Sequence, residues 1–332
     1  ATATTSTIAI GNQAGYTGQG ISAISIGYQA GYTAQGTNSV AIGTQAGQTN
    51  QGTQAVAIGI NSGQNGQSQY GVAIGNNSGQ SGQAIGSIAI GNQAGQTNQG
   101  SSAVAIGVGA GNYNQRTSTV AIGATSAQDS QGPYNIALGF GAGQSFQAIN
   151  STQGSCAIAI GQQAGRNSQG DYAVALGHNS GLTQQGPYNI AIGYQAGQSF
   201  QAITSNTSSS SIAIGYQAGN SSQQVGAIAI GYQSGNTAQG AYSIAIGNEA
   251  GETRQGSQSV AIGFQAGQFS QQNNVIAIGV QAGQFTQNNS AIAIGNTAGQ
   301  NSQSATSIAI GFSAGQQNQR SNAIAIGNQA GN

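Results

Sequence analysis

The stretch Ser39-Val40-Ala41-Ile42-Gly43 decides the fold, because close copies of it return along the whole 332-residue chain. Each copy ends in a glycine that follows a three-residue run, apolar throughout except at Ser25. These glycines are Gly11, Gly27, Gly43, Gly59, Gly75, Gly91, Gly107, Gly123, Gly139, Gly161, Gly177, Gly193, Gly215, Gly231, Gly247, Gly263, Gly279, Gly295, Gly311 and Gly327. Seventeen of the nineteen intervals are 16 residues, and two are 22. A fixed short period predicts stacked, nearly identical coils.

One coil can be described by counting the recurring glycine as position 1. Position 14 is always Ile or Val, position 16 always Ile or Leu, and position 15 is Ala except at Ser25. This alternation predicts a short strand with positions 14 and 16 pointing into the coil. Position 5 is Gly except at Ala127, so we expect a corner there, a second extended segment around positions 3 to 7, and another corner near positions 9 and 10.

The predicted fold class is therefore all-β, a parallel β-solenoid of about twenty 16-residue coils, with residues 1–332 as one continuous domain. Its expected core holds two branched aliphatics and one Ala or Ser from each coil. The alanines of position 15 are expected to face outward as a flat strip for lateral association, most simply as a trimer. On this interpretation, glutamate at Ala175 and Ala191 splits the oligomer and leaves the β-structure intact.

The composition excludes several classes of function. The chain has four Arg, four Asp or Glu, one His and no net charge, which leaves no electrostatic footprint for nucleic acid or an anionic membrane. No apolar stretch approaches the roughly 20 residues that span a bilayer, so we expect no membrane insertion. Weak charge repulsion favours self-association. Cys156 is the single cysteine and forms no intrachain disulfide.

Position 9 carries the most informative polar residue, because it is glutamine in all nineteen complete coils. We expect each amide to be partly buried, bonding to a corner of the backbone and to the glutamine of the next coil as a ladder. The residues of this ladder are Gln19, Gln35, Gln51, Gln67, Gln83, Gln99, Gln115, Gln131, Gln147, Gln169, Gln185, Gln201, Gln223, Gln239, Gln255, Gln271, Gln287, Gln303 and Gln319.

The segments Ser39-Val40-Ala41-Ile42-Gly43 and Ala103-Val104-Ala105-Ile106-Gly107 resemble the head repeats of trimeric autotransporter adhesins. The resemblance implies a left-handed parallel β-roll, three chains packed around an axis, and adhesion at a surface. The common repeat of that family is shorter and lacks the invariant glutamine. A looser likeness links the chain to repeat proteins of large DNA viruses.

Two coils, at 139–160 and 193–214, are longer by six residues. We place the insertions at Gln144–Ile149 and Gln198–Ile203, and expect them to bulge from one face as contact loops. The candidate contact residues are Phe146, Ile149, Phe200 and Ile203. A tolerated loop without a partner is the alternative.

Aromatic residues recur at position 2 and position 12. Tyr194, Tyr216 and Tyr232 stand at position 2, and Tyr172 and Tyr188 at position 12. Stacking that stabilises the coils is favoured, and binding of a glycan or partner chain is the alternative.

Nothing in the sequence predicts catalysis, a metal site or a cofactor. Glu249 and Glu252 share a coil with Arg254, which indicates a neutralised surface cluster rather than an acid–base pair. His178 stands at the variable position 2 and is expected to face solvent.

The two ends complete the predicted assembly. Ala1 falls at position 7 and Asn332 at position 6, so the chain holds twenty whole turns without capping segments. We expect the bare edges to dock head to tail, with an axial repeat of roughly 95 Å from coils spaced at about 4.8 Å.

The predicted function is a non-enzymatic structural protein that forms an extracellular, cell-surface or virion-surface fibre. Its partners are expected to be further copies of itself, joined head to tail and laterally. The main alternative is an adhesin head that binds a glycan or host receptor. A third class, ice binding, is weakened because the threonines of position 7 are interrupted, for example by Asn65, Tyr113 and Phe269.

Overall fold

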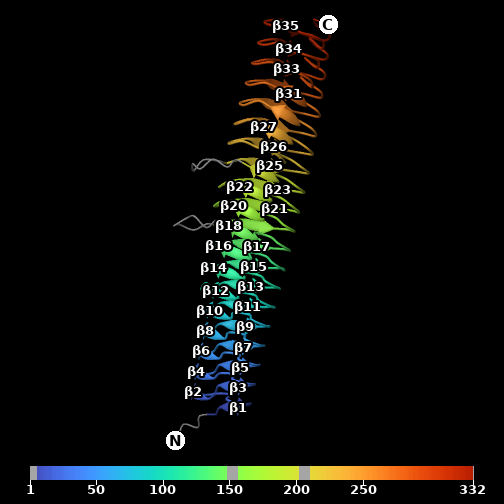
Figure 1. Ribbon diagram of the computed structural model, residues 1–332. Helices are drawn as coiled ribbons and strands as arrows, with labels where there is room; N and C mark the ends of the chain where they lie inside the picture. The colour runs from blue at the N-terminus through green and yellow to red at the C-terminus, as the bar shows by residue number, and fades with distance from the viewer. Residues whose placement is uncertain (1–5, 148–155, 202–209, 332) are drawn as a thin grey trace. The chain divides into compact units, whose positions relative to one another are not determined.

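The computed structural model describes residues 6–147, 156–201 and 210–331, and arranges them as stacked coils of short strands (Figure 1). The chain forms two compact units, Ala1–Asp171 and Tyr172–Asn332, and each is considered by itself. The described residues form strands, turns and bends and no helix. The predicted all-β parallel β-solenoid is confirmed, whereas a single continuous domain stays a prediction.

The first unit contains two parallel ladders. Positions 14–16 give β1 (Ile8–Ile10), β3 (Ile24–Ile26), β5 (Val40–Ile42), β7 (Val56–Ile58), β9 (Val72–Ile74), β11 (Ile88–Ile90), β13 (Val104–Ile106), β15 (Val120–Ile122), β17 (Ile136–Leu138) and β19 (Ile158–Ile160). Positions 7–9 give β2 (Thr17–Gln19), β4 (Thr33–Gln35), β6 (Thr49–Gln51), β8 (Asn65–Gln67), β10 (Ser81–Gln83), β12 (Thr97–Gln99), β14 (Tyr113–Gln115), β16 (Asp129–Gln131), β18 (Ser145–Gln147) and β20 (Asn167–Gln169). Each strand pairs in register with the strand of the next coil, as β7 does with β9 and β8 with β10.

The second unit repeats this plan. Its positions 14–16 give β21 (Val174–Leu176), β23 (Ile190–Ile192), β25 (Ile212–Ile214), β26 (Ile228–Ile230), β28 (Ile244–Ile246), β30 (Val260–Ile262), β32 (Ile276–Ile278), β33 (Ile292–Ile294), β34 (Ile308–Ile310) and β35 (Ile324–Ile326). Its other ladder is less regular, with β22 (Thr183–Gln185), β24 (Ser199–Gln201), β27 (Thr237–Gln239), β29 (Thr253–Gln255) and β31 (Phe269–Gln271). Isolated bridges such as Ser221↔Thr237 and Gln287↔Gln303 take the place of strands elsewhere.

The second strand of each coil lies later than predicted. It covers positions 7–9, as in β6, and positions 2–5 form a turn instead of an extended segment. The cause is backbone conformation, because positions 3 and 5 are left-handed, with φ of 55° at Gln45 and 51° at Gly47. The other corner then falls at positions 10–12, after the glutamine.

The core is built from alanine and glutamine, which reverses the expected packing. Ala57 at position 15 is fully buried, as are Ala46 at position 4 and Ala55 at position 13. Val56 and Ile58, at positions 14 and 16, are only partly covered, and Ile58 keeps 37% of its surface exposed. The prediction that the aliphatics fill the coil while the alanines of position 15 face outward is therefore wrong.

The width of the coil explains this inversion. A Cβ atom placed on Gly63, at position 5, would lie only 3.3 Å from the Cβ of Ala57 across the coil. The two sides of the coil, which we call its walls, are therefore so close that the space between them holds little more than a methyl group. A three-residue strand turns either its middle residue or its two outer residues inward. The narrow gap selects the small middle residue. Even Ser25 is buried there, and its Oγ donates to Gln35 Oε1 at 2.7 Å.

The glycine at position 1 is required by two features of the backbone. Gly59 has a φ of 126°, and a Cβ on it would lie 2.6 Å from the carbonyl oxygen of Gly75 in the next coil. An L side chain is therefore excluded by conformation and by the close stacking of the coils.

Position 8 offers a test of the backbone strain in each coil. Ala34 has a φ of 54°, whereas glycine holds the same position at Gly18 and Gly66, each with a φ of 71°. The left-handed region costs an L residue about 1–2 kcal/mol, and glycine loses about 0.5–1 kcal/mol in chain entropy. We expect Ala34→Gly to raise the free energy of unfolding by about 0.5–1 kcal/mol in urea melts, with Gly66→Ala lowering it. A loss of stability in Ala34→Gly would contradict the strain at this position.

Candidate functional site

The outward side chains of positions 14 and 16 form an aliphatic face on each unit, called the aliphatic face below. In the second unit Ile244 pairs in register with Val260, and Ile246 with Ile262. Ile246 and Ile262 each keep 36% of their surface exposed. The first unit repeats the pattern, as in the pairing of β13 with β15. Two rows of branched side chains thus face solvent in each unit.

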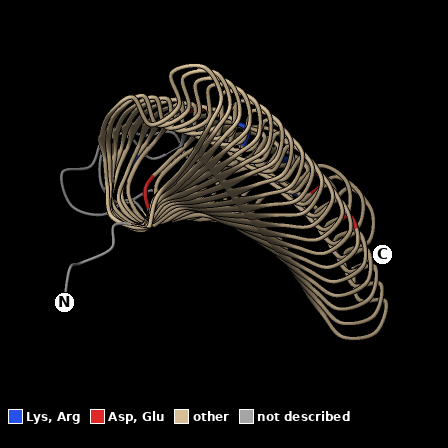
Figure 2. Ribbon diagram, turned by 90° about the horizontal axis from the view of Figure 1, so that it is seen from below, with Lys and Arg blue, Asp and Glu red and all other residues tan. Residues whose placement is uncertain are grey.

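The aliphatic face is free of formal charge. The four Arg and four Asp or Glu residues stand at positions 3, 6, 7, 8, 10 and 11, and never at positions 2, 12, 14 or 16. Figure 2 shows them as a few isolated blue and red segments among uncharged coils. Large apolar side chains flank the face instead, including Val108 and Phe140 at position 2 and Tyr134 at position 12, all more than half exposed. The face is thus apolar and uncharged along both units.

The strip predicted at position 15 does not exist. Ala175 and Ala191 are fully buried, so glutamate at either position would enter the core and not an interface. Their neighbours Val174 and Ile190 are the residues of these strands that are partly exposed.

The glutamines of position 9 lie between the two walls of the coil. Gln67 is 1% exposed, and its Nε2 donates to the carbonyl oxygens of Val56 at 2.8 Å and Gly71 at 3.1 Å. Its Oε1 accepts from Gln51 Nε2 at 3.2 Å. Most of these amides donate to a strand carbonyl, and several also bond to the glutamine of a neighbouring coil. Buried polar groups are stable only when bonded in this way.

Two outer amide ladders, at positions 3 and 6, were missed by the sequence analysis. At position 6, Gln80 Nε2 donates to Gln64 Oε1 at 3.0 Å, and Gln64 Nε2 donates to Gln48 Oε1 at 3.0 Å. At position 3, Gln45 Nε2 donates to Gln29 Oε1 at 3.2 Å. The signal was the recurrence of Gln at position 6, which Asn and other residues interrupt.

Glu249 and Glu252 occupy rungs of these outer ladders. Gln268 Nε2 donates to Glu249 Oε2 at 2.9 Å and to Glu252 Oε2 at 2.8 Å, and Gln265 Nε2 also reaches Glu249 Oε2. Among the described residues no ion pair joins Arg254 to either carboxylate, so the expected neutralised cluster is not formed. The carboxylates act as acceptors for the next coil.

The aromatic residues stack on one another along each ladder. Tyr216 lies between Tyr194 and Tyr232, with ring centroids 5.1 Å apart on both sides, and His178 stacks on Tyr194 at 5.2 Å. His178 is therefore partly covered by a ring instead of facing solvent alone. In a stack, each ring covers the face of its neighbour, and ring faces are the surfaces on which a sugar would stack. The columns are thus better suited to supporting the coils than to holding a glycan between their rings.

The insertions lie later than predicted. Ser199–Gln201 is a regular strand, β24, paired with β22, so the six extra residues fall between Gln201 and Ile212. Phe200 belongs to this strand and is 49% exposed. Phe146 likewise belongs to β18, and Ile149 and Ile203 lie outside the described residues. Their role as contact residues stays a prediction.

Asparagine at position 13 fastens the chain on both sides of the second insertion. Asn189 is fully buried, its Nδ2 donates to Gln201 O at 2.8 Å, and its Oδ1 accepts from Ser211 N at 2.8 Å. Asn135 accepts from Ala157 N at 2.8 Å in the coil that holds the first insertion. Each of these two asparagines lies in the coil before a long one. Its Oδ1 accepts from the position-13 amide of the long coil, which in an ordinary coil donates to the carbonyl oxygen of position 10.

The described residues contain no group of three or more His, Cys, Asp or Glu side chains that could hold a metal ion. They also contain no helix that is long and apolar enough to cross a membrane.

The comparisons with known proteins agree with this geometry. The family model of the YadA head domain repeat (2 copies) matches residues 19–46, 157–180 and 222–250. No curated protein matches the chain. The matched segments contain the strand of positions 14–16 and its glycine, which are the residues that carried the resemblance in the sequence. The chain is therefore a β-solenoid whose repeats are similar to the head repeats of trimeric autotransporter adhesins.

Proposed function

We propose that this chain is a non-enzymatic, adhesin-type surface protein whose copies associate side by side through their aliphatic faces, most simply as a trimer. The observation that carries the proposal is the outward placement of Ile, Val and Leu at positions 14 and 16. Burying each of these side chains contributes about 1.5–3 kcal/mol, less the part already covered within a coil. Summed over the coils of each unit, this is ample for a stable complex.

A second copy of the chain is the occupant that fits the aliphatic face. Its branched side chains recur once per coil, at the roughly 4.8 Å spacing of stacked strands. A partner that matches this spacing along many coils must have the same rise, which a parallel copy provides. The absence of charge at positions 2, 12, 14 and 16 removes repulsion between copies. The similarity to adhesin head repeats supports a trimer and a place at the cell surface.

Three finer functions are alternatives. An adhesin head that binds a glycan or host receptor is favoured by the family similarity. Head-to-tail growth into a fibre, including a fibre on a virion, and an ice-binding surface stay predictions without a specific observation in the folded chain.

Light scattering of the purified chain tests the proposal. A trimer of 32.5 kDa chains has a mass of 97.5 kDa, and this is the expected result. Glutamate at Val174 and Ile190 should lower the mass toward that of one chain while the far-ultraviolet circular dichroism keeps its β-signal. A wild-type mass of 32.5 kDa would contradict the proposal.

A further inference from the structure

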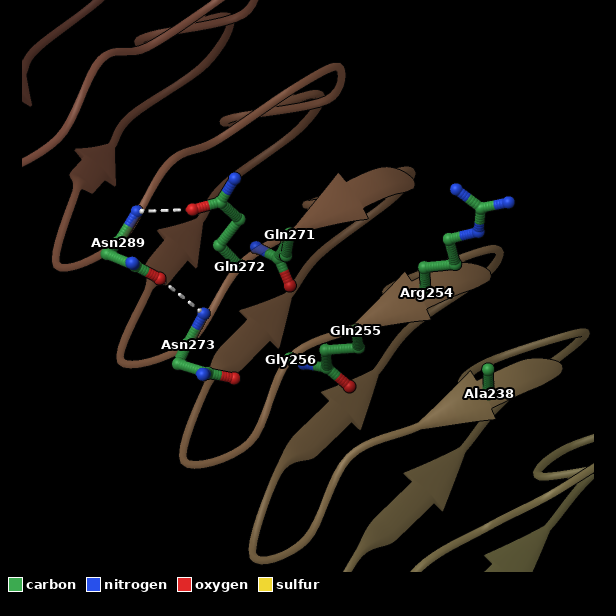
Figure 3. A pocket seen from close by; sticks show the side chains of 8 residues that line it. All are labelled: Ala238, Arg254, Gln255, Gly256, Gln271, Gln272, Asn273 and Asn289. Carbon is green, nitrogen blue, oxygen red and sulfur yellow. Dashed lines mark hydrogen bonds between the residues drawn. The ribbon is translucent and has the colours of Figure 1, made fainter.

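A polar groove runs along the corner between the ends of β29 and β31 and the turns that follow them, and is called the corner groove below. Its volume is about 370 Å³, within the range of small-ligand sites. Ala238 and Arg254 at position 8, Gln271 at position 9 and Asn273 at position 11 are among its lining residues. Figure 3 shows Arg254 extending from its strand, with Gln272 and Asn273 in one coil and Asn289 in the turn of the next.

The hydrogen bonds of the corner groove leave it rich in donors. Asn273 Oδ1 accepts from Ser257 N at 2.9 Å, and Asn289 Oδ1 accepts from Asn273 N at 3.1 Å. Gln272 Oε1 accepts from Asn289 N at 3.3 Å (Figure 3). The oxygens of these three side chains thus accept hydrogen bonds from backbone N–H groups. Within the described part of the chain, none of their NH₂ groups has a protein acceptor.

Arg254 adds a positive charge, and no ion pair to it is formed within the part of the chain that the structure describes. Glu252 stands two residues before it, but its carboxylate accepts from Gln268 Nε2 at 2.8 Å. A guanidinium group offers five donors in a planar fork that matches a carboxylate or a sulfate.

Gln271 lines the corner groove but turns its amide into the core of the coil. Its side chain is 3% exposed, and its Oε1 is buried without a hydrogen-bond partner. Its Nε2 donates along the stack to Gln287 Oε1 at 2.9 Å, unlike Gln67, whose amide is turned toward strand carbonyls. This Oε1 lies inside the coil, as do the unbonded Oε1 atoms of Gln51 and Gln83, and is not open to the groove.

We propose that the corner groove binds an acidic oligosaccharide, whose carboxylate or sulfate pairs with Arg254 and whose hydroxyls accept from the NH₂ groups of Gln272, Asn273 and Asn289. A single guanidinium among neutral amides suits a sugar that carries few charges. A nucleic acid would need a denser array of cations. Apart from Ala238 the lining is glycine and polar or charged side chains, so it lacks the apolar pockets that recognise peptide side chains.

A second groove of the same kind in the first unit supports this proposal. It has a volume of about 430 Å³ and is lined by Asn98 and Asn114 at position 8 and Arg116 at position 10. Asn98 Nδ2 donates to Asn114 Oδ1 at 3.0 Å, so the oxygen of Asn114 is again engaged within the protein. The chain has four arginines, and two of them lie in grooves at this corner of the repeat.

The inference rests on the proposed surface function, because an acidic glycan is a ligand that a surface protein meets. Binding to the full chain can be measured by surface plasmon resonance with sialyllactose, a sulfated disaccharide and neutral lactose. We expect at least one acidic sugar to bind and lactose to bind at least about tenfold more weakly. Which acidic sugar binds distinguishes a carboxylate from a sulfate ligand.

Substitutions locate the site. Arg116→Gln with Arg254→Gln should weaken binding of the acidic sugar about tenfold or more. Arg166→Gln also removes a positive charge, but Arg166 Nε donates to Gln144 Oε1 outside both grooves, so this control should leave affinity unchanged. No binding of either acidic sugar, or equal binding by the double variant, would overturn the proposal. Arginine-dependent binding of polyglutamate in place of the sugars would overturn it in favour of an acidic peptide.

The failure of this proposal can be told apart from failure of the proposed function. The groove variants should keep the wild-type mass in light scattering, because neither arginine belongs to the aliphatic face. A monomeric wild type would count against lateral association, whatever its affinity for sugars.

Discussion

Replacing Ala191 with glutamate is expected to lower the free energy of unfolding by more than about 4 kcal/mol, because it places an unpaired charge in a gap that holds a methyl group. Ala191 is fully buried and packs with Ala196, Ala213, Ala218 and Ala229. The neighbouring coils stack in register on β23, so an outward shift of this strand also strains them. Urea melts followed by circular dichroism measure the loss.

Ile190→Glu is the matched control for this substitution. It adds the same side chain one residue earlier, on a strand whose outer residues are partly exposed. We expect it to change the unfolding free energy of the separated chain little, while reducing association. Equal melting curves for Ala191→Glu and the wild type would contradict an alanine core.

Replacing Gln99 with alanine is expected to cost about 3–5 kcal/mol, because several buried groups lose their partners and a cavity remains. Gln99 is 1% exposed, and its Nε2 donates to Ile88 O at 2.7 Å, Ala103 O at 3.2 Å and Gln115 Oε1 at 3.3 Å. Its Oε1 accepts from Gln83 Nε2 at 3.3 Å. No water can replace these bonds without entering the narrow core.

Gln96 provides the comparison within the same coil. Its Nε2 donates to Gln80 Oε1 at 2.9 Å, but the side chain is only partly buried, so solvent can replace the lost bond. We expect Gln96→Ala to cost less than about 1 kcal/mol in the same denaturant melts. If Gln99→Ala lowered the free energy of unfolding no more than Gln96→Ala does, the buried glutamines of position 9 would not be essential to the fold.

The architecture was predictable because it depends on period and not on any single contact. The glycines at intervals of 16 residues, the short apolar run before each and the absence of long apolar stretches indicate stacked strands. Which face of the strand lies inside was not predictable from hydrophobicity. Alternation places either Ala57 or its neighbours Val56 and Ile58 in the core, and the usual preference for large aliphatics gave the wrong choice. Uniformly small residues at positions 4 and 15 were the signal that the interior is narrow.

The candidate sites were less predictable than the architecture, because they depend on how the coils fold and stack. The invariant glutamine singled out position 9 in the sequence. The hydrogen bonds of Gln67 to Val56 and Gly71 depend in addition on the distance between the two walls of the coil. The corner groove could not be found in the sequence. Arg254 and Asn273, 19 residues later, line the same groove, and the direction of each amide is set by backbone groups of the neighbouring coils.

Cross-linking between copies tests most directly whether the aliphatic face is the interface and alanine the core. The single cysteine, Cys156, is exposed and is first replaced by serine. Ile190→Cys or Ala191→Cys is then added, and each chain is treated with a short bismaleimide under native conditions. We expect covalent dimers from Ile190→Cys and only monomers from Ala191→Cys. Dimers from Ala191→Cys alone, or monomers from both variants, would contradict the outward placement of the aliphatic rows and the association built on it.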